Sequence, residues 1–249
     1  IVRDGGIEGV VVKLGRGFTQ MEVDGGSWIV NGAEKTPTTN HYPPSTISVG
    51  AACLDVHVAQ FACDNALGGL EFLVGIPGTI GGAVRMNAGA YGADMEKVLI
   101  AAEVVERDGA IRKLTKDELG FTYRNSRVSA GTVVTRAWLL AHPGNKDEIA
   151  RKMAEISSAR EETQPVRART GGSTFKNPIG HKAWELIEQA GCRGLTLGGA
   201  QVSEKHCNFL INTGNATAAD IENLGEEVIR RVKEKTGITR SEEHTSELQ

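Results

Sequence analysis

The chain has 249 residues, of which 40% are apolar and 24% charged, and it carries a formal net charge of −3 at pH 7. These values are typical of a soluble globular protein with one large domain or two modest ones. The acidic balance and the aromatic content of 5% argue against a nucleic-acid binder, which needs a basic face and often uses rings for base stacking.

Localisation and metal content follow from what the sequence lacks. No apolar run approaches the roughly 18 residues that a membrane span requires, and no signal peptide is visible. No C-x-x-C pair or metal-ligand spacing occurs among the four cysteines, Cys53, Cys63, Cys192 and Cys207. We therefore expect a cytoplasmic protein with reduced thiols, no metal site, and neither a membrane nor a nucleic acid as partner.

The first half of the chain is predicted to be mainly β-structure. A strand is expected over residues 7–14, short β-like runs over 21–23 and 28–31, and a polar loop over 33–45. Residues 55–66 have helical spacing, with Asp55 as the N-cap and Gly68-Gly69 as the stop. A hairpin is expected over 102–107 and 110–114, because Asp108-Gly109 favours a two-residue type I′ turn. A strand over 132–140 closes this region.

The second half alternates helices and strands. Helices are expected over residues 146–162, which end before Gln164-Pro165, and over 183–190, with Gly191 at C′. A strand is expected over 206–212. Thr217 and Asp220 form a capping box, and the helix that follows has a core stripe of Ile221, Leu224, Val228 and Val232. The whole chain is predicted to be α+β in two domains, which meet at the Pro/Gly break over residues 142–145.

A Gly-rich stretch lies inside the first half, from Gly75 to Gly92, and six of its eighteen residues are glycine. Glycines at 78, 81 and 82 leave the backbone bare, so main-chain N–H groups can close on an anion such as a pyrophosphate. The alternative is a tight turn followed by a close-packed, Gly-rich helix. The pattern is not the G-x-G-x-x-G dinucleotide fingerprint.

Four further motifs follow in order: Tyr123-Arg124-Asn125-Ser126-Arg127, Gln164-Pro165, residues 172–178 and residues 203–209. Together with the Gly-rich stretch they resemble the UDP-N-acetylenolpyruvoylglucosamine reductase family over residues 1–239. This resemblance implies a partial FAD-binding domain of the vanillyl-alcohol-oxidase type over 1–142 and a smaller α/β substrate-binding domain over 145–239. It also implies FAD-dependent reduction of UDP-N-acetylglucosamine enolpyruvate to UDP-N-acetylmuramate with NADPH, in peptidoglycan precursor synthesis.

The same resemblance implies roles for individual residues. Arg124 would bind the pyruvyl carboxylate and stabilise the developing enolate, and Ser173 would deliver the proton. The cofactor-binding residues would be Gly75, Pro77, Gly78, Thr79, Gly81, Gly82, Asn87, Gly89, Gly92 and Arg127. The substrate-binding residues would be Tyr123, Lys176, Asn177, His206 and Asn208.

The chain also departs from the family pattern. A Gly-Ser-Asn phosphate loop that the family carries upstream is not found, so we expect a chain truncated at both ends. Residues 240–249 match the translation of a common sequencing adapter, the alternative being a natural polar tail. The family's catalytic glutamate would fall in this tail, where we take Glu243 as a coincidence. The short link after Arg127 indicates the family branch that lacks a tyrosine lid. The rival predictions are another flavin-domain oxidoreductase and a non-catalytic nucleotide-binding fragment.

Overall fold

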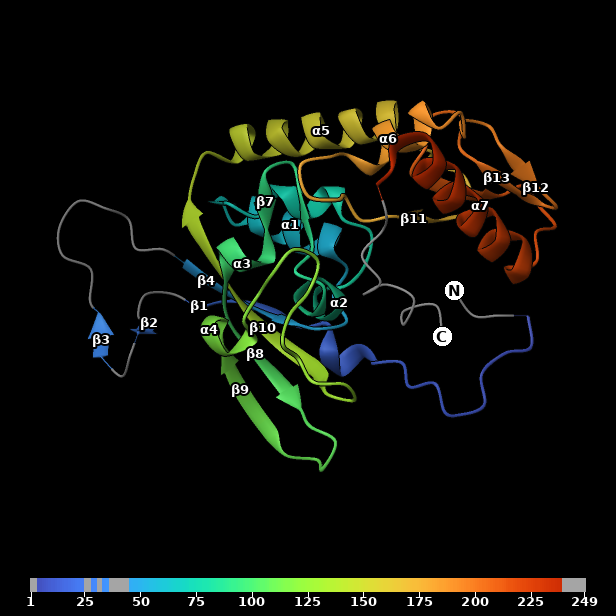
Figure 1. The fold of residues 1–249 in the computed structure, drawn as a ribbon. Coiled ribbons are helices and arrows are strands. Elements are labelled where there is room, and N and C mark those ends of the chain that lie inside the picture. Colours follow the sequence, from blue (N-terminus) through green and yellow to red (C-terminus); the bar gives the residue numbers. More distant parts are fainter. Residues whose placement is uncertain (1–3, 25–27, 31–32, 36–44, 239–249) are drawn as a thin grey trace. The chain divides into compact units, whose positions relative to one another are not determined.

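The computed structural model describes residues 4–24, 28–30, 33–35 and 45–238. The chain forms two compact units, one over residues 12–159 and the other from residues 1–11 together with 160–249 (Figure 1). Both units combine strands with helices, so the α+β expectation is confirmed. Each unit is described separately below.

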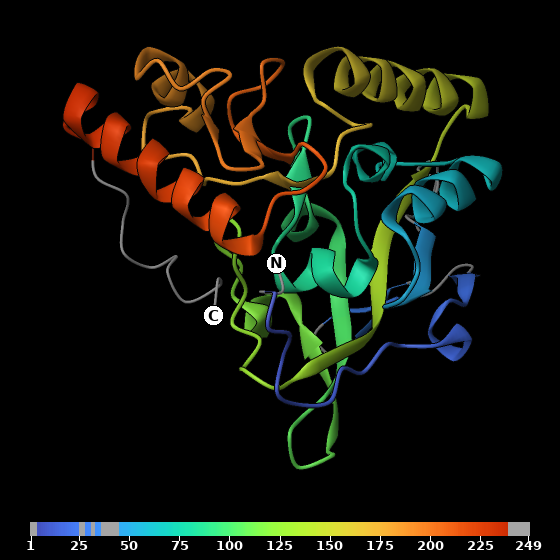
Figure 2. The same ribbon diagram turned by 90° about the vertical axis from the view of Figure 1, so that its right-hand side faces the viewer.

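The first unit is built on a six-stranded antiparallel sheet (Figure 2). Its strands lie in the order β1 (Met21–Asp24), β4 (Ser45–Gly50), β10 (Val133–Pro143), β8 (Leu99–Val105) and β9 (Ile111–Thr115), and β5 (Leu67–Gly68) also pairs with β10. Two small hairpins accompany the sheet, β2 (Trp28–Val30) with β3 (Ala33–Lys35) and β6 (Gly89–Ala90) with β7 (Ala93–Asp94).

The long strand β10 is the centre of this sheet, because it pairs with β4 on one side and β8 on the other. Its residues alternate between core and surface, as the period of two in a strand requires. Leu139 is fully buried and faces Ile47 and Leu99 in the two neighbouring strands, while Leu140 next to it is 41% exposed.

Helices complete the core of the first unit. They are α1 (Asp55–Asp64), α2 (Ile80–Arg85), α3 (Met95–Val98), α4 (Lys116–Leu119) and the first part of α5 (Lys146–Thr163), with 3₁₀ turns η1 (Arg16–Phe18) and η2 (Glu71–Gly75). Val58, Ile80 and Met95 are fully buried in one cluster with the sheet residues, and Ile149 and Met153 join it from α5. Helices too short to be stable alone are thus held by their apolar faces.

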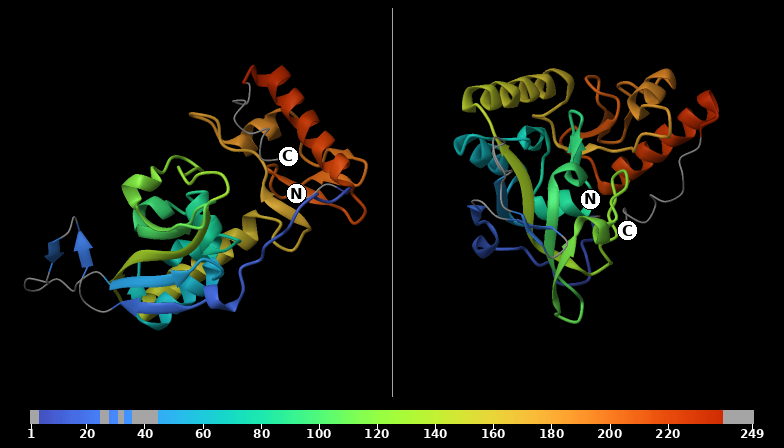
Figure 3. Two further views of the ribbon diagram at one scale, coloured as in Figure 1. Left: turned by 90° about the horizontal axis from the view of Figure 1, so that it is seen from below. Right: turned by 90° about the vertical axis from the view of Figure 1, so that its left-hand side faces the viewer.

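The second unit has a four-stranded sheet in the order β11 (Thr170–Ser173), β14 (Phe209–Asn212), β13 (Ala200–Val202) and β12 (Thr196–Leu197). Helices α6 (Ala183–Gln189) and α7 (Ala218–Thr236) belong to the same unit (Figure 3). The predicted capping box of α7 is confirmed, since Thr217 and Asp220 bond each other's backbone N–H groups. Its stripe is confirmed as core, with Leu224 and Val228 buried.

Several predictions on local structure were wrong. Residues 7–14 form no strand, and Val10 is 91% exposed, because an apolar, β-branched run makes a strand only where a neighbouring strand pairs with it. The expected loop over 33–45 begins instead with β3, while residues 36–44 lie outside the described part of the chain. The strand expected over 206–212 starts only at Phe209, since residues 206–208 form a turn.

Two further expectations failed on details of hydrogen bonding. The hairpin of β8 and β9 exists, but only Gly109 has a positive φ, of 87°, and Asp108 does not. A type I′ turn needs both, so the connection is a longer turn closed by Glu106 and Ala110. The N-cap of α1 is Leu54 and not Asp55, whose carboxylate makes no capping bond. The helix also ends at Asp64, before the predicted glycine stop.

We expect Leu139→Ala to lower the free energy of unfolding by about 2–5 kcal/mol, because it removes a fully buried side chain from the central strand. Leu140→Ala is the matched control on the same strand and should cost less than about 1 kcal/mol. Urea denaturation followed by circular dichroism measures both. Equal losses for the two variants would contradict the burial pattern.

Candidate functional site

The Gly-rich stretch is attached by its backbone to the segment that follows β4. The N–H of Gly81 donates to the carbonyl of Ala51 at 2.9 Å, and that of Ile80 donates to Cys53 at 3.0 Å. The N–H of Asp55 in turn donates to the carbonyl of Gly78 at 3.1 Å. Both segments are therefore fixed to each other by backbone hydrogen bonds, and α2 begins at this junction.

The glycines of the stretch serve different physical purposes. A Cβ on Gly81 would come within 3.0 Å of the Ala51 Cβ, so this position requires close packing. A Cβ on Gly82 would meet no atom within 4 Å, so nothing in the protein itself requires glycine there. Gly78 has a φ of +152° and is exposed. Gly81 thus fits the interpretation as a close-packed helix, whereas Gly78 and Gly82 leave bare backbone exposed, and anion binding there stays a prediction.

Other residues of the predicted cofactor set fall into the same two groups. Gly75 and Gly89 are close-packed, because an added Cβ would lie within 2.7 Å of the Tyr91 ring and of the Asp94 Cβ respectively. Gly92, with a φ of +81°, and Pro77 are exposed. Thr79 is the N-cap of α2, without a side-chain capping bond.

Arg124 lies on a tight turn in which Thr122 and Asn125 exchange backbone hydrogen bonds. Its φ of +55° is unusual for a residue with a side chain. The guanidinium donates from Nη2 to the carbonyl of Gly89 at 2.7 Å and from Nη1 to that of Asn87 at 3.4 Å. The fold thus brings Arg124 directly onto the Gly-rich stretch, more than thirty residues upstream.

Two neighbours of Arg124 are placed differently. The Tyr123 ring is 54% exposed, with its centroid 5.2 Å from the Arg124 guanidinium carbon. Arg127 is also exposed, and its aliphatic part covers Gly120 at the end of α4. Arg127 therefore packs on Gly120, whereas Arg124 donates hydrogen bonds to the Gly-rich stretch.

The second unit carries Ser173 at the end of β11, opposite Phe209 of β14. Ser173 is exposed, and the loop after it is held by Asn208. The Asn208 side chain accepts from the Phe175 N–H at 2.9 Å and donates to the Phe175 carbonyl at 2.8 Å. Asn208 is 5% exposed, so its amide is shielded from water and holds the loop with two hydrogen bonds, as pairing with a strand would.

Three more predicted residues lie around this loop. Asn177 accepts from the N–H of Ala183, the first residue of α6, at 2.9 Å. His206 accepts from the Asn208 N–H at Nδ1, at 3.2 Å, and its ring meets Phe209 edge-on at 4.9 Å between centroids. Burial lowers the pKa of His206, so the ring is neutral at pH 7 and carries its hydrogen on Nε2.

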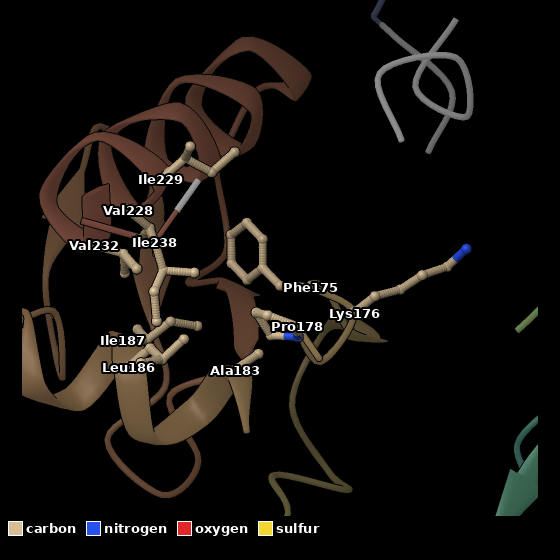
Figure 4. Close-up of a pocket in the computed structure, with 10 residues that line it drawn as sticks. All are labelled: Phe175, Lys176, Pro178, Ala183, Leu186, Ile187, Val228, Ile229, Val232 and Ile238. Atoms are coloured by element: carbon tan, nitrogen blue, oxygen red, sulfur yellow. The ribbon is translucent and has the colours of Figure 1, made fainter. Parts of the chain in front are cut away.

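A small apolar pocket of roughly 60 Å³, open to solvent, lies between α6 and α7 (Figure 4). The Phe175 ring points into this pocket, whereas the Lys176 side chain extends away from it, with the ammonium group at the far end. Leu186, Ile187 and Val228 provide much of its wall. Ser173 does not line this pocket. The apolar lining of the pocket does not suit a charged ligand.

The comparisons with known proteins extend over both units. Residues 1–115 match the FAD binding domain family, and residues 164–245 match the family described as UDP-N-acetylenolpyruvoylglucosamine reductase, C-terminal domain. The UDP-N-acetylenolpyruvoylglucosamine reductase of Acidiphilium cryptum is 57% identical over 238 residues, covering 96% of this chain and 71% of the relative. That of Gluconobacter oxydans is 53% identical, with coverage of 96% and 72%.

This chain belongs to the UDP-N-acetylenolpyruvoylglucosamine reductase family. The crystal structure of the reductase from Thermus caldophilus is similar in fold, with a TM-score of 0.68 and 43% sequence identity, over 76% of this chain and 69% of that one. The expected order, an FAD-binding domain before the family's smaller C-terminal domain, is confirmed. The rival prediction of a different flavin-domain oxidoreductase is not favoured.

Two further findings concern the described residues of this family member. None of the helices found there has both the length and the apolar character needed to cross a bilayer. In the same part of the chain, no three His, Cys, Asp or Glu side chains gather as ligands of a metal ion.

Sequence reasoning missed two features of the site. Ser126 donates from Oγ to the Arg85 carbonyl at 2.7 Å, and Arg85 donates from Nη1 to the Ser126 carbonyl at 3.1 Å. The sequence predicts Asp55 as a helix cap, but its side chain is fully buried and neither carboxylate oxygen has a hydrogen-bond partner among the described residues. The motif that contains Ser126 gave a reason to look for the Ser126–Arg85 pair. No local sequence signal indicates the burial of Asp55.

Burial raises the pKa of Asp55 from its ordinary value of 3.8 to about 7. Between these two values the folded protein holds a proton that the unfolded chain has already released. The free energy of unfolding therefore falls as the pH rises from about 4 to 7, and this contribution is constant above pH 7.

We expect Asp55→Asn to remove this pH dependence while it keeps the size of the side chain. Urea titrations of the cofactor-free wild type and variant at pH 5 and pH 8 measure the effect. The wild type should lose more stability than the variant between these values, by an amount on the order of 2–3 kcal/mol. A parallel response of the two proteins would show that Asp55 is ionised in the folded state.

Proposed function

We propose that this protein catalyses the FAD-dependent reduction of UDP-N-acetylglucosamine enolpyruvate to UDP-N-acetylmuramate with NADPH, in the cytoplasm. The reaction supplies a precursor of peptidoglycan. The observation that carries the proposal is the seating of Arg124 on the Gly-rich stretch, in a chain of this reductase family. It joins the proposed cofactor site and a proposed catalytic cation within one compact unit.

The described residues fit FAD at the Gly-rich stretch. Gly78 and Gly82 are exposed, and Gly82 has open space where a side chain would otherwise stand. Bare backbone of this kind allows main-chain N–H groups to approach a pyrophosphate. We assign a cofactor contact to Gly92 on the same grounds, one to Thr79 through its hydroxyl, which makes no capping bond, and one to Pro77 through its exposed ring, since proline has no N–H. The close-packed glycines are assigned the structural support of the stretch. Bound FAD would take a hydride from NADPH and pass it to the vinyl carbon of the substrate.

Arg124 is proposed to bind the pyruvyl carboxylate of the substrate. A guanidinium stays charged and can bind a carboxylate through two parallel N–H donors. As negative charge builds up beside that carboxylate during hydride transfer, a cation that is already in place stabilises it without reorganising. The bonds from the Arg124 guanidinium to Asn87 and Gly89 provide such a fixed position. Arg127 remains a proposed flavin or phosphate contact.

Ser173 is proposed to deliver a proton from Oγ to the substrate carbon next to the one that receives the hydride. Its exposure and its position beside the Asn208-held loop support this role. A serine hydroxyl is a weak acid, so the donor needs help from neighbouring charge or hydrogen bonds. Lys176 and Asn177, in the loop that follows, are proposed to contact the substrate there.

The remaining substrate contacts are proposed on both units. Tyr123 lies beside Arg124 and offers an exposed ring to the substrate. His206 is neutral and can donate from Nε2 to an oxygen of the sugar nucleotide. Asn208 has its amide engaged with Phe175, so we assign it the support of the substrate loop. We keep residues 1–142 and 145–239 as the proposed domains for FAD and for substrate.

Arg124→Ala and Ser173→Ala should each slow the oxidation of reduced flavin by the enolpyruvyl sugar nucleotide, by roughly 100-fold or more. Reduction of the flavin by NADPH should change little, because neither residue is proposed to act in that step. Stopped-flow absorbance of the flavin separates the two half-reactions. Equal loss of both would mean damaged flavin binding, and no dependence of wild-type turnover on the sugar nucleotide would sink the proposed function.

Gly81→Ala and Gly82→Ala form a matched pair on consecutive residues of α2. Gly81→Ala should lower the melting temperature of the cofactor-free protein, because its Cβ meets Ala51. Gly82→Ala should raise stability by up to about 1 kcal/mol, as expected for alanine in a helix, yet weaken FAD binding by filling the open space. Thermal denaturation and FAD titration by fluorescence quenching test both. Unchanged FAD affinity in Gly82→Ala would place the cofactor elsewhere.

A further inference from the structure

We propose that Asn87 is a positioning residue for Arg124, which it holds in the place needed to receive the substrate carboxylate. This inference rests on the role proposed above for Arg124. It gives Asn87 a different task from the cofactor contact that the sequence suggested. All the contacts between Asn87 and the Arg124 turn lie within the first unit.

The Asn87 side chain is committed to the protein at both ends of its amide. Nδ2 donates to the carbonyl of Thr122 at 3.0 Å, and Oδ1 accepts from the backbone N–H of Glu96 at 2.9 Å. The residue is 5% exposed, so the amide is shielded from competing water. Its φ of +42° suits asparagine, which tolerates the left-handed region better than most residues.

The bond to Thr122 reaches the turn that carries Arg124. The Thr122 carbonyl also accepts from the Asn125 N–H at 3.2 Å, and this second bond closes the turn around Arg124. Arg124 itself has a φ of +55°, a conformation that persists only where the surroundings impose it. Asn87 is one of the groups that impose it, because it holds the carbonyl on which the turn closes.

Arg124 in turn donates a hydrogen bond back to the backbone of Asn87. The Asn87 carbonyl accepts from Arg124 Nη1 at 3.4 Å, so one residue holds the turn with its side chain and the guanidinium with its backbone. On the other side of Arg124, Ser126 and Arg85 exchange two hydrogen bonds. The Arg124 turn is thereby tied on both sides to residues 85–89, which belong to the Gly-rich stretch. The guanidinium position is thus set relative to the proposed flavin site.

Two substitutions of Asn87 distinguish the hydrogen bond that its amide donates from the one that it accepts. Asn87→Asp keeps an oxygen that can accept from the Glu96 N–H but loses the donor to Thr122. Asn87→Gly loses both bonds and still permits the left-handed backbone. If Asn87 acts through the Arg124 turn, both variants should show the same defect. If only the bond to Glu96 mattered, Asn87→Asp would behave like the wild type.

The test uses the FAD-loaded full chain and a double-mutant cycle with Arg124→Ala. We expect each Asn87 variant to slow flavin oxidation by the enolpyruvyl sugar nucleotide about tenfold and to weaken binding of that nucleotide to the oxidised protein. Flavin absorbance, FAD affinity and reduction by NADPH should stay within about twofold. In the Arg124→Ala background, the Asn87 substitutions should cause no further slowing, because the group they position is gone.

Thr115→Ala is the control for a general loss of stability in the same unit. It removes the capping box of α4, in which Thr115 and Glu118 bond each other, and should leave both half-reactions unchanged. The inference would be overturned if the Asn87 substitutions slowed flavin oxidation in the Arg124→Ala background as much as they do in the wild type. Equal loss of both half-reactions in the Asn87 variants would also overturn it. A normal rate in Arg124→Ala alone would instead overturn the proposed role of Arg124, and with it the need for positioning. The two failures are therefore seen in different variants.

Discussion

The close approach of the Gly-rich stretch to the segment after β4 is the constraint on which the first unit depends. The Ala51 carbonyl accepts from Gly81 at 2.9 Å, while the Ala51 N–H donates to the Thr135 carbonyl of the central strand at the same distance. The stretch is thereby linked through one residue to the middle of the sheet. A side chain at Gly81 would strain this contact, because its Cβ would meet the Ala51 Cβ at 3.0 Å and one of the two segments would have to shift. Asn87 and Gly89 lie further along this stretch, and Arg124 donates to both of their carbonyls.

In each unit one buried asparagine holds a loop that carries a proposed site residue. Asn87 joins the Gly-rich stretch to the Arg124 turn, and Asn208 joins the loop after Ser173 to its neighbouring turn. An amide side chain carries both a donor and an acceptor, so it can satisfy two backbone groups at once where no regular strand pairing reaches them. Each asparagine is 5% exposed, and burial strengthens such bonds because water cannot compete for them. Irregular loops are in this way given fixed positions.

Asp55 shows the opposite arrangement. It is fully buried beside Gly78, and neither oxygen has a hydrogen-bond partner among the described residues. Burial of an unpaired carboxylate favours its protonated form, which is why its pKa is raised to about 7. Below pH 7 a mostly protonated acid therefore lies beside the segment proposed to bind an anionic cofactor. An ionised carboxylate at that position would repel a pyrophosphate, so the protonated form is compatible with the proposed site.

The sequence by itself determined the features that local signals specify. Thr217 and Asp220 predicted the start of α7, the spacing of Leu224 and Val228 predicted its buried face, and the ordered motifs indicated the family. Only the tertiary structure decided what depends on distant partners. The apolar run over residues 7–14 forms no strand, Asp55 is buried where a cap was expected, and Arg124 contacts a carbonyl 35 residues upstream. Caps and helical stripes act within a few residues, whereas strand pairing, desolvation and long-range hydrogen bonds exist only once the chain has folded.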